Sequence, residues 1–213
     1  MEIILDLGLE IWGAGTARTL RPIWMAEELN LSYTLHPIGP RTGETKTEKY
    51  TALNPKQKIP LLQHEDFVLS ESVAICRYLQ KISNSENIFV PMNSKVMALE
   101  DEWCNFIYGE LDETSLYVMR RHHDLKDIYG DSPKVVESCR NYFDKHLTVI
   151  ENTLMKKGTL FGYDFGLADI LLTTCLDWAI AYEFNLPENV SRYHKEIQNR
   201  EAYKKAFKIN YKE

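Results

Sequence analysis

The sequence predicts a small α/β domain followed by an all-helical domain. Residues 1–82 carry apolar patterns that alternate between strand and helix, in the order β-α-β, a loop, and then β-β-α. Residues 83–95 are rich in Ser, Asn and Pro, as linkers are. In residues 96–213 the apolar side chains recur at helical spacing. We therefore expect two domains that bury separate cores, joined by this linker.

The first strand and the first helix follow from the first thirty residues. The apolar residues of 3–9 predict a strand, which the segment Gly13-Ala14-Gly15 interrupts. Residues 19–29 have a helical pattern that contains Pro22. A proline is tolerated in the first turn of a helix, where its missing N–H costs nothing. We therefore expect this helix to begin near Arg18–Thr19.

A second strand, a hairpin and another helix complete the α/β domain. Residues 31–38 predict a strand at the edge of the sheet, because Pro37 removes a donor from the ladder. After a polar loop and a short turn, residues 58–63 and 67–69 predict a hairpin. The segment Ser70-Glu71-Ser72 then begins a helix that runs to about residue 81.

The second half of the chain contains only helical patterns. Residues 167–182 are apolar nearly all round, which predicts a buried central helix. Residues 201–207 predict a short last helix. The apolar residues at helical spacing before the central helix are Trp103, Phe106, Ile107, Leu111, Val118, Val136, Cys139, Phe143, Leu147, Ile150 and Leu154.

Composition restricts the class of protein. Hydrophobic residues make up 44% and charged residues 26% of the chain, as in ordinary globular proteins. The net charge of −6 argues against nucleic acid as the main partner, because phosphate binding needs a basic surface. No apolar run approaches the roughly 20 residues of a membrane span, and the N-terminus lacks the basic region of a signal peptide. We expect a cytoplasmic protein that neither binds nucleic acid nor enters a membrane.

The four cysteines predict neither disulfides nor a metal site. Cys76, Cys104, Cys139 and Cys175 lie far apart and fit no metal-ligand spacing. Each falls in an apolar helical pattern, so we expect buried thiols.

The segment from Asn54 to Leu61 is the first candidate for chemistry. If the Ile59–Pro60 bond is cis, the backbone of Ile59 is exposed, and its N–H and C=O can pair with an extended peptide as a strand edge does. A trans proline that merely begins an edge strand is the alternative. The pattern alone leaves both open.

The start of the helix after the hairpin is the second candidate. Free N–H groups and the positive end of the helix dipole bind a carboxylate well. Ser72 adds a hydroxyl donor, and the Glu71 carboxylate suits an ammonium group. Together they fit the zwitterionic head of an amino acid. The alternative is capping alone, with Ser70 as the N-cap.

These features together resemble the glutathione transferase family, in its cytosolic, bacterial-like form. The resemblance covers essentially the whole chain: the strand–helix–strand start, the turn Asn-Pro-Lys-Gln-Lys-Ile-Pro, the Ser-Glu-Ser helix start and the helical second half. Residues 161–170 are similar to the stretch that caps the family's buried central helix, with Gly166 as N-cap and Asp169 at N3. Residues 200–203 are similar to the start of its late C-terminal helix. The resemblance implies a thioredoxin-like N-terminal domain and an all-α C-terminal domain.

The resemblance also implies a role for each residue of the corner. Glutathione is the implied co-substrate, and no metal is implied. Ile59 pairs through its backbone with the cysteinyl part, and Pro60 is the cis proline. Glu71 and Ser72 hold the γ-glutamyl head. Lys58 and Gln57 face the glycine carboxylate.

The residue that activates the thiol is less well defined. The family places a Tyr, Ser or Cys near the first strand–helix junction, and a hydroxyl donated to a thiolate favours the charged form. Residues 1–30 contain no Tyr and no Cys. The hydroxyl position falls on Thr16 or Thr19, with a slight preference for Thr16, and either residue also fits a simple N-cap. Arg18 aids the thiolate or is simply solvated.

The implied activity is conjugation of glutathione to a small hydrophobic electrophile by a homodimer. Tyr108 and Tyr117 are candidates for the electrophile pocket, together with Arg18, although tyrosines at such spacing are also ordinary packing residues. Two alternatives stay open: another glutathione chemistry, such as reduction or isomerisation, and a non-catalytic binding module on the same fold.

Overall fold

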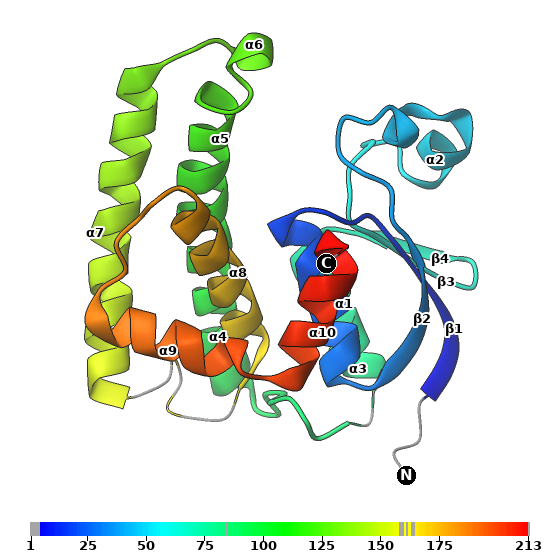
Figure 1. The fold of residues 1–213 in the computed structure, drawn as a ribbon. Helices are drawn as coiled ribbons and strands as arrows, with labels where there is room; N and C mark the ends of the chain where they lie inside the picture. The colour runs from blue at the N-terminus through cyan, green and yellow to red at the C-terminus, as the bar shows by residue number, and fades with distance from the viewer. Residues whose placement is uncertain (1–4, 84, 158–159, 161, 163–164, 213) are drawn as a thin grey trace. The chain divides into compact units, whose positions relative to one another are not determined.

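The computed structural model describes residues 5–83, 85–157, 160, 162 and 165–212. It divides into two compact units, Met1–Val90 with Gln198–Glu213, and Pro91–Ile197. The first unit contains a four-stranded mixed sheet with helices, and the elements of the second unit are helical (Figure 1). The predicted fold class, α/β followed by all-α, is confirmed.

The first unit follows the predicted order β-α-β and then β-β-α, with two short helical segments in the loop between. Its elements are β1 (Leu5–Trp12), α1 (Ala17–Glu28), β2 (Leu31–His36), the 3-10 turn η1 (Glu44–Lys46), α2 (Glu48–Leu53), β3 (Leu61–His64), β4 (Phe67–Ser70), α3 (Ser72–Ile82) and α10 (Glu201–Tyr211). Residues 3 and 4, where the first strand was predicted to begin, lie outside the described residues.

The strand order of the sheet is β2-β1-β3-β4. Strand β1 is parallel to β2 and antiparallel to β3, and β3 and β4 form the predicted hairpin. Strand β2 lies at the edge, as predicted. Pro37 follows its last residue, His36, and therefore ends the strand instead of lying within it.

The predicted place of Pro22 in the first turn of α1 was wrong. The helix begins at Ala17, so Pro22 is its sixth residue and lies in the second turn. The start is set by a capping box, in which the Thr16 side chain accepts from the N–H of Thr19 and the Thr19 side chain accepts from the N–H of Thr16. These two bonds give partners to the N–H groups of Thr16 and Thr19. The helix then continues past Pro22, which has no N–H to donate.

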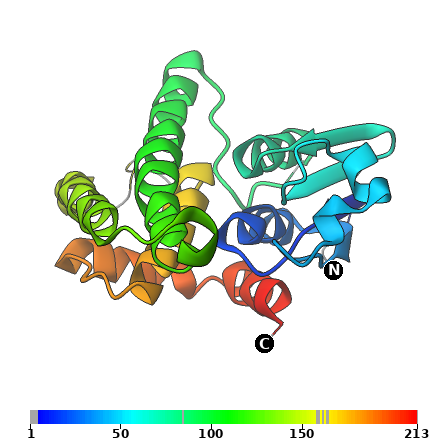
Figure 2. The ribbon, with the colours of Figure 1, turned by 90° about the horizontal axis from the view of Figure 1, so that it is seen from above.

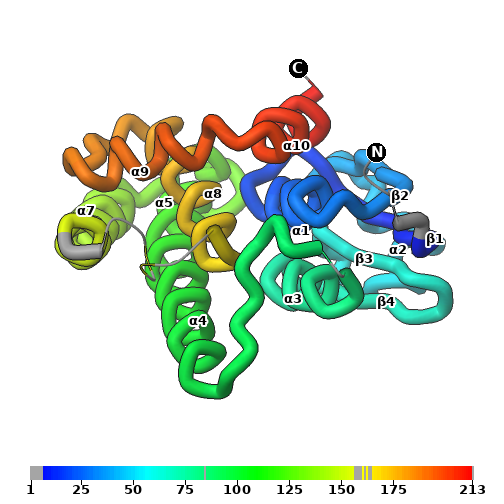
Figure 3. Tube along the Cα trace, turned by 90° about the horizontal axis from the view of Figure 1, so that it is seen from below, coloured from blue at the N-terminus to red at the C-terminus, as the bar shows by residue number. Residues whose placement is uncertain are grey.

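Helices α10, α1 and α3 lie side by side in that order (Figure 3). Arg200, the N-cap of α10, donates two hydrogen bonds of 2.7 Å to the Glu28 carboxylate of α1. Trp24 donates its indole N–H to the same carboxylate at 2.9 Å and packs edge-on against Tyr203. The buried Glu28 carboxylate thus accepts hydrogen bonds from Arg200 and from Trp24, and the ion pair of Glu28 with Arg200 holds α10 on α1.

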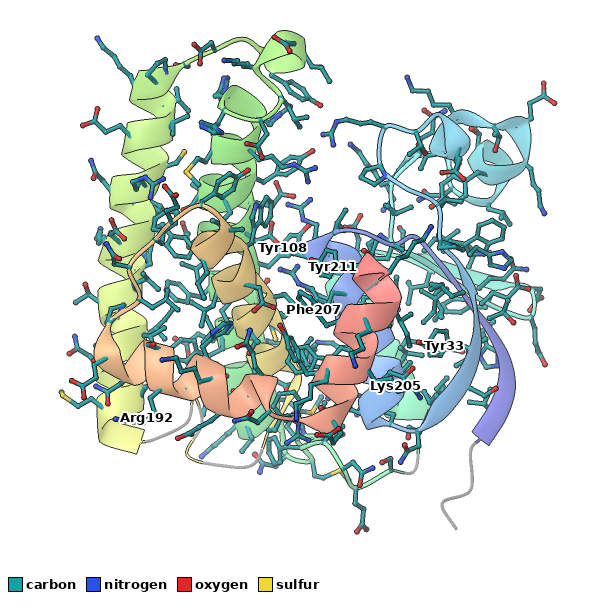
Figure 4. The ribbon with its side chains drawn as sticks, viewed as in Figure 1. Tyr33, Tyr108, Arg192, Lys205, Phe207 and Tyr211 are labelled. Carbon is teal, nitrogen blue, oxygen red and sulfur yellow. The ribbon has the colours of Figure 1, made fainter. Side chains whose placement is uncertain are left out.

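A second ionic contact joins α10 to α1. Glu27 accepts a hydrogen bond of 2.8 Å from the Tyr33 hydroxyl of β2, and its other oxygen lies 2.6 Å from Lys205 Nζ of α10. Tyr33 and Lys205 are both labelled in Figure 4. Burial, together with the neighbouring carboxylate, raises the pKa of Tyr33, so its hydroxyl stays a neutral donor.

Helix α10 is longer than predicted, because it continues four residues past Phe207 to Tyr211. Its buried side chains are Tyr203, Ala206 and Asn210, which lie on one face. The division predicted from sequence, with residues 96–213 as one helical domain, stays a prediction. The compact units of the structure group α10 with the first unit, since it packs on α1.

The second unit is built from helices that surround α8. Helix α4, the π-helix η2 and α5 follow one another as one long rod (Figure 2). Segment η2 packs against α7 and α8. The elements are α4 (Ser94–Phe106), η2 (Ile107–Tyr117), α5 (Val118–His122), α6 (Lys126–Tyr129), α7 (Pro133–Lys157), α8 (Leu167–Ala181) and α9 (Glu188–Gln198).

Helix α8 is the buried centre of this unit, as predicted. Gly166 is its N-cap, and Asp169 accepts a hydrogen bond of 2.8 Å from the Gly166 N–H. The other oxygen of Asp169 accepts from the hydroxyl of Tyr193, on α9. Burial and the Asp169 charge raise the pKa of Tyr193, which keeps the hydroxyl a donor. Residues 161, 163 and 164, part of the predicted capping stretch, lie outside the described residues.

The structure also bears on the cysteines and on the question of a membrane-spanning helix. All four cysteines are free and buried, as predicted. Among the described residues, no helix combines the length and the apolar character that crossing a membrane requires.

Two loops of the first unit meet at Gly13, directly after β1. Gly13 has φ +115°, and a Cβ there would lie 2.7 Å from the Cβ of Ile59 and 2.9 Å from the Cγ2 of Thr19. Neither approach is possible for a residue with a side chain. Glycine at this position therefore lets the loop before α1 touch the loop that contains Ile59 and Pro60.

Replacing Asp169 tests the capping of α8. Asp169→Ala removes the reciprocal cap and leaves the buried Tyr193 hydroxyl without its acceptor, so we expect a loss of roughly 2–4 kcal/mol in the free energy of unfolding. Urea denaturation measures it. Asp131→Ala, at an exposed position, is the control and should change the stability by less than about 0.5 kcal/mol. Equal effects of the two substitutions would contradict this role.

Replacing Gly13 tests the contact between the loops. Gly13→Ala combines an unfavourable positive φ with a clash against Ile59, so we expect a loss of about 3 kcal/mol or more. Gly109→Ala is the matched control, because nothing lies within 4 Å of its added Cβ and its backbone is helical. That control should be neutral or stabilising by up to about 1 kcal/mol. Thermal denaturation of both variants distinguishes them, and a Gly13→Ala protein as stable as the control would refute the close contact.

Candidate functional site

The corner at Pro60 has the geometry that the peptide-binding interpretation of its sequence requires. The Ile59–Pro60 bond is cis. The Ile59 side chain packs against the apolar cluster formed by Trp12, Tyr50 and Leu61. Within the described part of the chain, neither the N–H nor the C=O of Ile59 pairs with another protein group. The corner therefore presents an unpaired strand edge, which is what an extended peptide needs.

Two residues that the sequence analysis did not single out hold this corner in place. The carbonyl of Lys58 accepts hydrogen bonds from the Tyr50 hydroxyl at 2.6 Å and from Asn54 Nδ2 at 2.8 Å. Asn54 is buried, and its own carbonyl accepts from the N–H of Gln57 at 2.9 Å. Burial raises the pKa of Tyr50, so its hydroxyl is a donor at neutral pH. The Asn-Pro turn is the signal that points to Asn54, since such residues bond to nearby backbone.

Lys58 and Gln57, predicted to face a carboxylate, lie on the exposed side of the corner. Gln57 has φ +53°, and its side-chain amide donates to the Thr51 hydroxyl at 3.2 Å. The Lys58 backbone is fixed by Tyr50 and Asn54, while its side chain is in solvent. The structure thus places a cation and an amide next to the unpaired edge of Ile59.

The N-terminus of α3 is open, as the proposed carboxylate site requires. Its N-cap is Glu71, so the alternative with Ser70 as N-cap is wrong; Ser70 is the last residue of β4. No side chain of the described residues caps α3. Its first N–H groups and its positive dipole end are therefore available to an anion.

Arg21 adds a buried positive charge beneath this helix start. Its side chain is fully buried in α1, and its Nη1 donates to the Ser72 hydroxyl oxygen at 3.3 Å. Because Ser72 accepts from Arg21, its own hydroxyl proton is left to donate to a ligand oxygen. No role was predicted for Arg21 from the sequence. The signal is a cation within the buried face of a helix, between Leu20 and Ile23, where cations are rare unless partnered.

Glu71 is held in an uncommon backbone conformation. Its φ of +76° lies in the region that residues with a Cβ rarely adopt, at a cost of about 1–3 kcal/mol. Its carboxylate forms an ion pair of 2.7 Å with Lys56, another residue the sequence analysis did not single out, and both side chains are more than half exposed. The carboxylate is thus on the surface beside the open helix start, where an ammonium group can reach it.

The two candidate threonines have different surroundings. Thr19 is fully buried, and its hydroxyl donates to Asn210 Oδ1 at 2.7 Å. Thr16 is half-buried, and its hydroxyl oxygen accepts from the Thr19 N–H at 3.0 Å. The two hydroxyl oxygens lie 3.0 Å apart. The arrangement favours Thr16 as a donor to a ligand, because the Thr19 proton has a protein acceptor.

The remaining candidates contribute less. Arg18 is half-buried in the first turn of α1. Tyr108 and Tyr117 lie in the second unit, on η2, and both are half-buried. The Tyr108 hydroxyl is 3.4 Å from the Glu113 carboxylate, and Arg121 lies over the Tyr117 ring at 5.7 Å. Their role in binding an electrophile stays a prediction. Among the described residues, no group of three or more His, Cys, Asp or Glu side chains is placed to hold a metal ion.

Family models match most of the chain. Residues 7–81 match the N-terminal domain of glutathione S-transferase, and residues 110–201 match its C-terminal domain. The first match contains the corner at Pro60 and the start of α3, and the second contains most of the helical unit.

Individual relatives agree with these models. Glutathione S-transferase theta-1 of Bos taurus is 27% identical over 172 residues, which cover 79% of this chain and 72% of that protein. GstA of Escherichia coli O157:H7 is 29% identical over 157 residues, 72% of this chain and 74% of that protein. A glutathione transferase of Phanerochaete chrysosporium, solved in complex with oxidized glutathione, superimposes with a TM-score of 0.85 at 21% identity over 96% of each chain. On the two domain matches and this shared fold, the chain belongs to the glutathione S-transferase family.

Proposed function

We propose that this protein is a glutathione transferase that binds glutathione at the Pro60 corner and activates its thiol for conjugation to a small hydrophobic electrophile. The observation that carries the proposal is the contact at Gly13. It brings the loop that contains Thr16 against Ile59, which supports a site that combines a hydroxyl donor with an unpaired backbone edge. We expect a peptide thiol docked on that edge to come within reach of the Thr16 hydroxyl.

The two ends of glutathione find complementary groups. The γ-glutamyl carboxylate is held by the open start of α3 and the Ser72 hydroxyl, with the buried Arg21 charge beneath them. The γ-glutamyl ammonium pairs with Glu71, whose carboxylate has room for both this group and Lys56. The glycine carboxylate faces Lys58 and Gln57. The cysteinyl N–H and C=O pair with Ile59.

The chemistry needs a thiolate near neutral pH. A hydrogen bond from the Thr16 hydroxyl stabilises the charged sulfur and lowers the pKa of the bound thiol. The thiol proton leaves to solvent. The sulfur lone pair then forms a C–S bond with the electrophilic carbon of an aryl halide, and the carbon–halogen bond breaks with release of halide. The four cysteines of the chain are buried, which favours this hydroxyl-assisted route over one that uses a protein thiol.

Thr16 variants test the activation step. Thr16→Ala removes the donor, so we expect the pKa of the bound glutathione thiol to rise by about one to two units and kcat/KM at neutral pH to fall about tenfold to hundredfold. The pKa comes from the ultraviolet absorbance of the thiolate in the binary complex, and kcat/KM from conjugation to a chromogenic aryl halide.

Two further variants serve as controls for Thr16. Thr16→Ser keeps both the cap and the hydroxyl and should keep the activity. Thr19→Ser keeps the hydroxyl of the other candidate and should keep the activity as well. A Thr16→Ala enzyme with the wild-type pKa would refute the assignment. Glutathione binding by calorimetry without turnover on any electrophile would instead favour a binding module.

Glu71 and Ser72 variants test the binding of the γ-glutamyl head. Glu71→Gln removes the partner of the ammonium, and Ser72→Ala removes one donor to the carboxylate. We expect each to raise the KM for glutathione by about tenfold, while kcat at saturation changes much less, because these groups do not touch the sulfur. Glu65→Gln, in the β3–β4 turn, is the matched control and should leave KM unchanged. A fall in kcat with constant KM would contradict this role.

A further inference from the structure

Asn210, near the end of α10, reaches the loop before α1 from the opposite end of the chain. Its side chain is 1% exposed. Oδ1 accepts from the Thr19 hydroxyl at 2.7 Å and from the Gly15 N–H at 3.2 Å. Nδ2 donates to the carbonyl of Thr16 at 3.1 Å. The backbone carbonyl of Asn210 accepts from the Gly15 N–H at 2.9 Å.

These partners fix the orientation of the Asn210 amide. The Gly15 N–H is only a donor, so it requires Oδ1, and the Thr16 carbonyl is only an acceptor, so it requires Nδ2. The Thr16 carbonyl already accepts from the Leu20 N–H at 3.0 Å and from Nδ2. The Thr19 hydroxyl lies 2.9 Å from that carbonyl and 2.7 Å from Oδ1. Because the carbonyl already has two donors, we assign the single Thr19 proton to Oδ1, the shorter contact.

The commitment of the Thr19 proton determines what Thr16 can do. The Thr19 oxygen offers its lone pairs to Thr16 and accepts from the Thr16 N–H at 3.0 Å. The Thr16 hydroxyl oxygen accepts from the Thr19 N–H. The Thr16 hydroxyl proton is then left to the Thr19 oxygen, which lies 3.0 Å away, and it can turn from that oxygen toward a ligand because no acceptor-only group holds it.

Hydrogen bonds, and not packing, hold the loop at this point. Gly15 is exposed, has φ +82°, and has nothing within 4 Å of the position of a Cβ. Its N–H bonds to the backbone and side-chain oxygens of Asn210 are the contacts that locate it within the described residues. Removing them frees a glycine next to Thr16, and glycine loses more conformational freedom on ordering than any other residue.

We infer that Asn210 is a positioning residue for thiol activation, which holds the Gly15–Thr16 loop and the Thr19 proton so that the Thr16 hydroxyl is presented to the glutathione sulfur. This inference rests on the proposed function. It assigns to the last helix of the chain a part in the chemistry, in addition to its packing on α1. The sequence of the helix does not indicate this role, because the partners of the Asn210 side chain lie near the other end of the chain.

The test compares Asn210→Ala with Arg200→Gln, which loosens the other end of the same helix from α1. In Asn210→Ala we expect the pKa of the bound thiol to rise by about one unit, with kcat/KM at neutral pH about tenfold lower and the KM for glutathione within about threefold of wild type. In Arg200→Gln we expect a lower Tm and an unchanged thiol pKa. Circular dichroism and Tm establish that both variants are folded.

A second pair of variants keeps the inference falsifiable if Asn210→Ala does not fold. Thr19→Val keeps the shape of the side chain but removes the proton that Asn210 accepts, and Thr19→Ser keeps that proton. We expect the thiol pKa to rise in the valine variant and to stay at the wild-type value in the serine variant. A folded Asn210→Ala or Thr19→Val protein with the wild-type thiol pKa overturns the inference alone. A wild-type protein that does not bind glutathione overturns the proposed function, and this inference with it.

Discussion

The contact between Gly13 and Ile59 is the constraint on which the candidate site depends. These residues belong to two separate loops, one between β1 and α1 and one before β3, and only a glycine allows them to touch. The Ile59 side chain packs against the apolar cluster, and its backbone has no partner among the residues that the structure describes. This one close approach joins the two loops from which we propose the site is built.

The parts of the site that local patterns define could be predicted from the sequence. The Asn-Pro turn and Pro60 indicated either an exposed peptide edge or a plain strand start, and the Glu71-Ser72 segment either an open helix start or simple capping. The family resemblance favoured the first of each, and the cis Ile59–Pro60 bond and the uncapped start of α3 agree with it. The same holds for the fold, since the alternation of strand and helix patterns and the later helical spacing each depend on neighbouring residues. The buried α8, with Asp169 at its third helical position, was also found because capping is a local interaction.

The parts that depend on distant residues could not be predicted. The rule on proline placed Pro22 in the first turn of α1, but the Thr16–Thr19 capping box starts the helix earlier. The Thr19 hydroxyl donates to Asn210, nearly two hundred residues away and beyond the predicted end of the last helix, and this contact supports our choice of Thr16. Arg21 was given no role, because its burial and its contact with Ser72 of α3 depend on the tertiary structure. The capping box is a local contact that the rule on proline overrode, whereas the contacts of Asn210 and Arg21 are tertiary, and periodicity carries no information about them.

A crystal structure of the protein with glutathione bound tests the central claim most directly. The account predicts that the cysteinyl N–H and C=O pair with the backbone of Ile59, that the γ-glutamyl head lies at Glu71 and Ser72, and that the sulfur lies within hydrogen-bond reach of the Thr16 hydroxyl. Glutathione bound elsewhere, or a sulfur that faces a different donor while Thr16 stays bonded within the protein, would contradict it.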